Sequence, residues 1–108
     1  MAVTMGVVTD PKEKAFFRRG FRKAKLELEA NQAVWKELNA KLSTDLKFRE
    51  QHDQRWIVVC HGQFLGSYEK CSYAMDAAEA NGGTRYASPQ TSIELYDSTG
   101  RTAHVGFV

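Results

Sequence analysis

A long stretch without helix breakers constrains this fold more than any other feature. From residue 12 to residue 44 the chain has no proline and a single glycine, Gly20. The residues before it are typical of a helix start: Asp10 can cap free N–H groups, Pro11 suits the first helical position, and Glu13 can complete a capping box. The sequence therefore predicts one long N-terminal helix.

The apolar positions of this helix follow a seam. Their steps alternate between four and three residues, which is typical of a helix that packs along one stripe or forms a coiled coil. The candidate interface residues of the seam are Phe17, Phe21, Leu28, Trp35, Leu38 and Leu42, with Ala24 and the polar Asn31 completing the spacing.

The length of the helix leaves alternatives open. A continuous helix would be about 50 Å long at about 1.5 Å per residue, whereas a domain of this size has a radius of gyration of roughly 13 Å. The helix could break near Asn31 and fold back as a helical hairpin. It could instead stay straight, with the seam docking a second copy or a partner helix, or packing on the chain's own sheet.

Basic side chains crowd the first part of the same helix. Residues 10–25 carry seven basic groups against Asp10 and Glu13, a net charge of +5, while the whole chain carries only +2. This asymmetry indicates an acidic partner for the N-terminal segment. The basic stripe that we expect to bind consists of Lys14, Arg18, Arg19, Arg22, Lys23 and Lys25.

The second half of the chain predicts a small sheet. "RWIVVCHGQFLGSY" is typical of a β-hairpin with the turn at His61–Gly62, which pairs Cys60 with Gln63, Val59 with Phe64, Val58 with Leu65 and Trp56 with Ser67. Both faces of this hairpin are apolar, so each needs a cover, and the two flanking helices are the candidates.

A short helix and a second hairpin complete the chain. Cys71, Ala74, Met75 and Ala78 form one helical stripe that Gly82–Gly83 ends, and a loop at 85–90 follows. Residues 91–108 then predict two more strands around the turn "DSTG". A shorter helical piece capped by Ser43 or Thr44 precedes the first hairpin.

Together these segments predict an α+β protein. We expect an N-terminal stretch (1–9), a basic, heptad-patterned helical arm (10–43), and a ββαββ domain (44–108) with an antiparallel or mixed four-stranded sheet.

The hairpin resembles a family of small prokaryotic domains of unknown function. Those domains combine a basic residue and "W-V-A-V", a "D-G" turn, a "V-V-G-S" return strand and an acidic helix that ends in glycine. The shared residues, within about 50–83, are Arg55, Trp56, Val58, Val59, Gly62, Gly66 and Ser67, while His61 replaces the acidic turn residue. The resemblance implies an α+β fold and implies no activity.

Residues capable of chemistry are few and poorly spaced for it. His52, Cys60, His61, Cys71 and His104 include no pair with zinc-ligand spacing, and adjacent residues such as Cys60 and His61 cannot form a nucleophile–base hydrogen bond in a strand. The sequence contains no nucleophile elbow, phosphate-binding loop or dinucleotide fingerprint. We therefore expect no metal, no cofactor and no enzymatic activity.

The sequence favours a binding or regulatory module. The basic helix is expected to contact an acidic protein surface or a second copy. Two alternatives stay open: a nucleic-acid-binding regulator that uses phosphate contacts, and a stand-alone inhibitor of the kind that phages direct against host nucleic-acid machinery. The opening residues lack the features of a secretory signal, so we expect a cytoplasmic protein with free thiols and no membrane contact.

Overall fold

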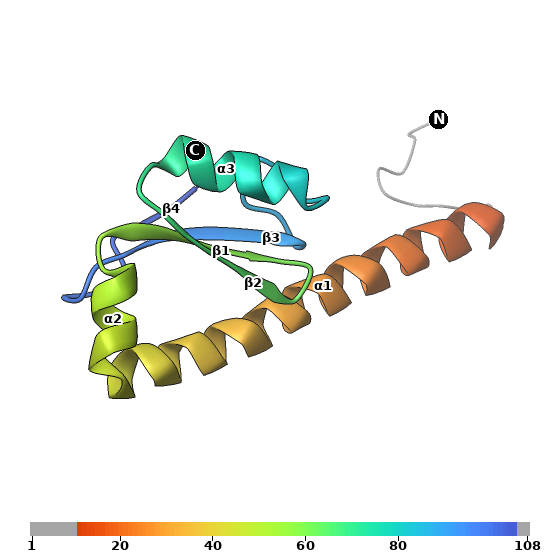
Figure 1. Cartoon of the computed structure of the whole chain (residues 1–108). Coiled ribbons are helices and arrows are strands. Elements are labelled where there is room, and N and C mark those ends of the chain that lie inside the picture. The colour runs from red at the N-terminus through yellow and green to blue at the C-terminus, as the bar shows by residue number, and fades with distance from the viewer. Residues whose placement is uncertain (1–10, 106–108) are drawn as a thin grey trace.

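The computed structural model describes the backbone of residues 11–105 and the side chains of residues 22–105. The elements, in chain order, are α1 (Pro11–Thr44), α2 (Leu46–His52), β1 (Arg55–Cys60), β2 (Gln63–Tyr68), α3 (Cys71–Ala80), β3 (Thr91–Tyr96) and β4 (Ala103–His104). The strands form one sheet in the order β2-β1-β3-β4, and every neighbouring pair is antiparallel (Figure 1). The predicted α+β architecture is confirmed, and the sheet is antiparallel rather than mixed.

Helix α1 begins at Pro11, as predicted, and runs without a break to Thr44. The alternative of a helical hairpin that turns near Asn31 is therefore wrong. Asn31 does not interrupt the helix because its side chain is buried and bonded to other parts of the fold, as described below.

The junction between α1 and α2 lies slightly later than predicted. Asp45 leaves the helical conformation, and its carboxylate accepts a hydrogen bond from the Phe48 N–H at 3.1 Å, so Asp45 is the cap of α2. Ser43 and Thr44, the predicted caps, instead donate their hydroxyls to carbonyls one turn earlier in α1.

The first hairpin has the predicted turn and a partly different register. His61 and Gly62 both have positive φ angles (50° and 72°), which a two-residue hairpin turn of type I′ requires. The pairs Cys60–Gln63 and Val59–Phe64 are confirmed, but a β-bulge then pairs Val58 with Gly66 and Trp56 with Tyr68.

Helices cover both faces of the sheet, as the apolar pattern predicted (Figure 1). On one face the buried side chains are Trp35, Leu38 and Leu42 of α1 with Ile57 and Val59 of β1, and Val34, Phe48, Phe64 and Tyr96 pack against them. On the other face the buried side chains are Val58, Ala74, Ala78, Ile93 and Val105, and Trp56, Leu65, Tyr68, Cys71 and Met75 pack against them.

Only the second half of α1 lies on the sheet. The β1–β2 turn contacts α1 at Ala30, where a Cβ added to Gly62 would lie 3.1 Å from the Ala30 Cβ. Towards its N-terminus the helix extends past this turn and away from the sheet (Figure 1). We call residues 11–30 the projecting arm. The molecule is consequently elongated, with extents of 61 × 25 × 24 Å.

Candidate binding surface on the projecting arm

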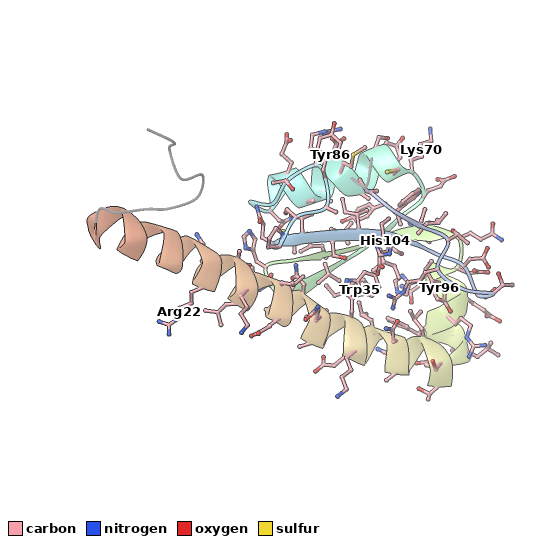
Figure 2. All side chains as sticks on the ribbon, turned by 180° about the vertical axis from the view of Figure 1, so that it is seen from behind. Arg22, Trp35, Lys70, Tyr86, Tyr96 and His104 are labelled. Carbon is pink, nitrogen blue, oxygen red and sulfur yellow. The ribbon has the colours of Figure 1, made fainter. Side chains whose placement is uncertain are left out.

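The described basic residues of the projecting arm are exposed. Arg22, Lys23 and Lys25 face solvent, and Figure 2 shows Arg22 directed away from the sheet. Lys25 has a carboxylate partner, Glu29, at 3.9 Å, but both side chains are more than half exposed, so this pair adds little stability. The side chains of Lys14, Arg18 and Arg19 lie outside the described residues.

Two leucines are exposed among these cations. Leu26 is 59% exposed and Leu28 is 47% exposed. Leu26 lines a shallow hollow of about 430 Å³ together with Arg22, Lys23, Glu27 and Ala30. Leu26 therefore lies beside Arg22 and Lys23, whereas Leu28 lines a different hollow, together with Asn31 and Trp35 of the seam.

The seam residues separate into two groups at Asn31. Trp35, Leu38 and Leu42 are at most 8% exposed and lie in the protein's own core, so they pack on the sheet rather than forming a docking surface. Among the described residues before Asn31, Leu28 is the seam leucine that stays exposed. The side chains of Phe17 and Phe21 lie outside the described residues.

Trp35 is held by specific contacts as well as by burial. Its Nε1 donates a hydrogen bond to Ser92 Oγ at 2.9 Å, and the Arg101 guanidinium lies 4.3 Å from the centre of its ring. These contacts fix the second half of α1 to Ser92 of strand β3 and to Arg101, which lies between β3 and β4.

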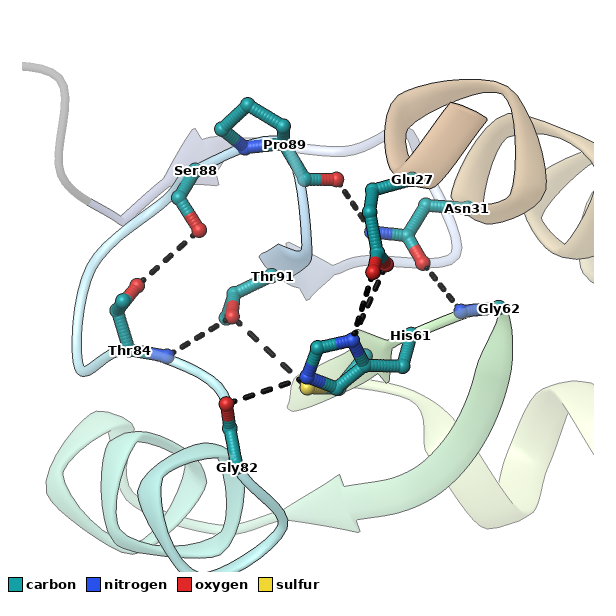
Figure 3. Close-up of polar contacts among 10 residues, drawn as sticks. Glu27, Asn31, His61, Gly62, Gly82, Thr84, Ser88, Pro89 and Thr91 are labelled. Atoms are coloured by element: carbon teal, nitrogen blue, oxygen red, sulfur yellow. Dashed lines mark hydrogen bonds and ion pairs between the residues drawn. The ribbon is translucent and has the colours of Figure 1, made fainter. Parts of the chain in front are cut away.

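Asn31 fixes α1 at the point where the arm leaves the sheet. Its Oδ1 accepts a hydrogen bond from the Gly62 N–H at 2.8 Å, and its Nδ2 donates to the Pro89 carbonyl at 3.0 Å (Figure 3). With an exposed fraction of 2%, this amide satisfies two backbone groups from different loops.

Glu27 and His61 form a second contact between the arm and the body. The Nδ1 of His61 lies 3.1–3.2 Å from both carboxylate oxygens of Glu27, and its Nε2 lies 3.1 Å from the Gly82 carbonyl (Figure 3). Carboxylate and carbonyl oxygens only accept, so this geometry is complete only when both ring nitrogens carry a proton. The Gly82 carbonyl, followed by the Glu27 carboxylate, accordingly raises the pKa of His61.

The groups considered for catalysis or metal binding are not brought together. Cys60 is buried, and burial raises the pKa of its thiol; its Sγ lies 3.8 Å from Thr91 Oγ1. His104 pairs with Glu94 at 3.0 Å, and Arg101 pairs with the same carboxylate at 3.1 Å. Among residues 22–105, no three His, Cys, Asp or Glu side chains cluster as metal ligands would.

Some residues of this surface were not recognised from the sequence. Leu26 lies off the seam, on the side of α1 that faces away from the sheet, and the seam pattern gives no reason to single it out. The sequence predicts only a turn at His61, whereas its contact with Glu27 joins residues 34 positions apart. Asn31 did carry a signal, because it is the one polar member of the seam.

Comparison of the chain with protein-family models, with curated proteins and with solved structures found no match. The resemblance of the first hairpin to domains of unknown function stays an expectation. Within the part of the chain that the structure describes, no helix has the length and hydropathy needed to cross a bilayer.

Proposed function

We propose that this protein is a non-catalytic binding module whose projecting arm docks onto an acidic protein surface. The observation that carries the proposal is the exposure of Leu26 beside Arg22 and Lys23 on a helix that extends beyond its own sheet. A helix that presents apolar and basic groups together is suited to a groove with an apolar floor and acidic rims.

The exposed leucines favour a protein partner over nucleic acid. Phosphate contacts need cations and no aliphatic side chains, and stacking onto bases uses exposed aromatic rings rather than leucines. Burying Leu26 and Leu28 against a protein would instead contribute roughly 25 cal/mol per Å² of apolar surface that is removed from water. The basic groups would then orient the complex and increase its rate of formation.

A second copy is a less favoured partner for the same surface. Two arms that met through their basic faces would repel each other, because residues 10–25 carry a net charge of +5. A copy could dock only through its acidic parts, outside this segment. Light scattering at several protein concentrations separates this case from a foreign partner before any partner is sought.

The proposal is tested by charge reversal on the arm. Arg22→Glu with Lys23→Glu should abolish capture of the partner from a nuclease-treated lysate, because both attraction and steering are inverted. Lys36→Glu with Lys47→Glu is the matched control, since both lysines are exposed but lie outside the projecting arm, Lys36 in the second half of α1 and Lys47 in α2. We expect the control to capture the partner as the unchanged protein does.

Titration of the intact protein with duplex and single-stranded DNA and RNA at two salt concentrations tests the alternative that the arm binds nucleic acid. Binding that falls steeply with salt and is lost in the Arg22→Glu, Lys23→Glu variant would assign the arm to phosphates instead. Equal capture by the arm variant and the control variant would also overturn the proposal.

A further inference from the structure

A second site lies at the other end of α1, far from the projecting arm. The end of α1, helix α2 and the β1–β2 hairpin lie together at one end of the molecule (Figure 1). A cavity of about 490 Å³ opens between them. It is lined by Lys41, Phe48, Gln51, His52, Arg55, Phe64, Gly66 and Ser67. Nothing in the proposed docking of the arm involves these residues.

The cavity is cationic. Lys41 comes from α1 and Arg55 from β1, and no carboxylate lines the cavity among the described residues. Neither cation has an ion-pair partner within residues 22–105: the Lys41 ammonium lies 4.4 Å from the centre of the Phe48 ring, and Arg55 bonds only to Ser67. Two uncompensated positive charges beside one polar cavity favour an anion.

Arg55 is held in a fixed orientation. Its Nε donates to Ser67 Oγ at 3.1 Å, and one terminal nitrogen donates to the Ser67 carbonyl at 3.0 Å. The guanidinium has five N–H donors, so further donors remain for a ligand. A preorganised cation of this kind loses little freedom when an anion binds.

His52 adds a directed donor to the same cavity. It is 5% exposed, and its Nδ1 lies 2.6 Å from Ser67 Oγ. Because Arg55 already donates to this hydroxyl, both groups are best satisfied when Ser67 donates its proton to Nδ1, which places the ring proton on Nε2. Nε2 has no partner within the described residues, and none of their fully buried side-chain nitrogens is unsatisfied, so Nε2 is partly accessible in a ring that lines the cavity.

We propose that this cavity binds a phosphate group, as inorganic phosphate or as a phosphate monoester of a small molecule. The guanidinium of Arg55, the ammonium of Lys41 and the Nε2–H of His52 are the donors, and they approach from three different elements. A phosphate dianion matches the two cations in charge, and its tetrahedrally arranged oxygens can accept from donors that approach from three directions, whereas a carboxylate is planar and carries a single charge. The volume of the cavity leaves room for the organic part of a monoester.

Binding at this site is coupled to the protonation of His52. Burial, followed by Arg55 and then Lys41, lowers the pKa of His52. The charged groups that face the ring are therefore Lys41 from α1 and Arg55 from β1, while β2 contributes the uncharged Ser67 and Phe64. An anion beside Nε2 favours the imidazolium, so bound phosphate raises the pKa of His52 and the protein takes up protons.

The site is tested by NMR of the His52 imidazole in the full chain during titration with inorganic phosphate at low salt. We expect saturable shifts of the His52 resonances with a dissociation constant in the millimolar range, and a higher His52 pKa in the phosphate-bound protein. Sulfate, a dianion that does not titrate near neutral pH, should raise this pKa as well. Adenosine monophosphate should bind and adenosine should not.

Lys41→Gln should weaken phosphate binding about tenfold, since it removes one charge-assisted contact at an exposed position. Lys47→Gln removes the same charge from α2 outside the cavity and should leave the affinity within about twofold. Equal weakening by both variants, absence of shifts at His52, or binding of adenosine without its phosphate would overturn the proposal. The arm variants keep this site intact, so the two proposals fail independently.

Discussion

Asn31 shows at the scale of one residue how a break in a pattern can mark a structural contact. A polar residue in an apolar seam is compatible with a break in the helix, with a contact to a partner molecule, or with a buried amide that forms hydrogen bonds inside the protein. The sequence does not distinguish these three cases. The structure places its amide between the Gly62 N–H and the Pro89 carbonyl, which come from loops that meet only in the folded chain. The polar residue is therefore what fastens the helix where the projecting arm begins.

We predict that Asn31→Leu destabilises the protein although it completes the apolar seam. The substitution leaves the Gly62 N–H and the Pro89 carbonyl without their partners, which costs about 2–4 kcal/mol in the free energy of unfolding. Gln32→Leu is the control, because Gln32 is exposed on the same turn of α1 and should change stability by less than about 0.5 kcal/mol. Urea unfolding measures both variants. An Asn31→Leu variant as stable as the unchanged protein would contradict the assignment.

His61 provides a pH-dependent contact between the arm and the body. Its pKa is raised above the ordinary 6.5 by Gly82 and Glu27, so the folded state binds a proton more tightly than the unfolded chain. This contribution to stability is fully present below the unfolded pKa and is lost as the pH rises through the folded pKa. The free energy of unfolding of the unchanged protein should therefore exceed that of Glu27→Gln by less at about pH 8 than at about pH 6. The difference should be small, because the His61 ring is partly exposed and solvent screens its interaction with Glu27. A difference that stayed constant, or grew, across this range would contradict the prediction.

At the scale of the helices and strands, apolar periodicity in the sequence predicts which elements form. It does not predict the register of the first hairpin or where the sheet ends beneath α1. The long helix, both faces of the first hairpin and the stripe of α3 follow from apolar spacing that each element needs in order to bury one side. The bulge that moves Val58 from Leu65 to Gly66 could not be predicted, because Leu65 lies on the Val58 face in either register. The seam likewise shows which side of α1 is apolar, but not where the sheet beneath it ends.

Trp35 distinguishes a core seam from an interface seam. We predict that Trp35→Ala lowers the free energy of unfolding by about 3–5 kcal/mol, because it empties a buried site and removes the hydrogen bond to Ser92. Leu28→Ala should cost less than about 1 kcal/mol, since that side chain is nearly half exposed. Chemical denaturation measures both. A Trp35→Ala variant that kept its free energy of unfolding but no longer formed an oligomer would show that Trp35 lies in an intermolecular interface instead.

At the scale of the whole molecule, the sheet domain and the projecting arm carry different properties. The described core clusters draw on residues from Val34 onward, while the excess positive charge lies at 10–25. Helix α2 lies at the opposite end of α1 from the arm (Figure 1). Residues of α2 line the candidate phosphate cavity. This separation allows the arm to engage a partner without disturbing the core, and it allows each site to be altered alone.

Photo-crosslinking in cells tests the role of the arm most directly. A benzophenone-bearing amino acid is placed at position 26 of the arm, and in a second variant at position 73, where Tyr73 is 51% exposed on α3 across the sheet. We predict a discrete adduct with an acidic protein from position 26 and none from position 73. Adducts from position 73 alone, or a nucleic-acid adduct from position 26, would contradict the proposal that the projecting arm is a protein-docking surface.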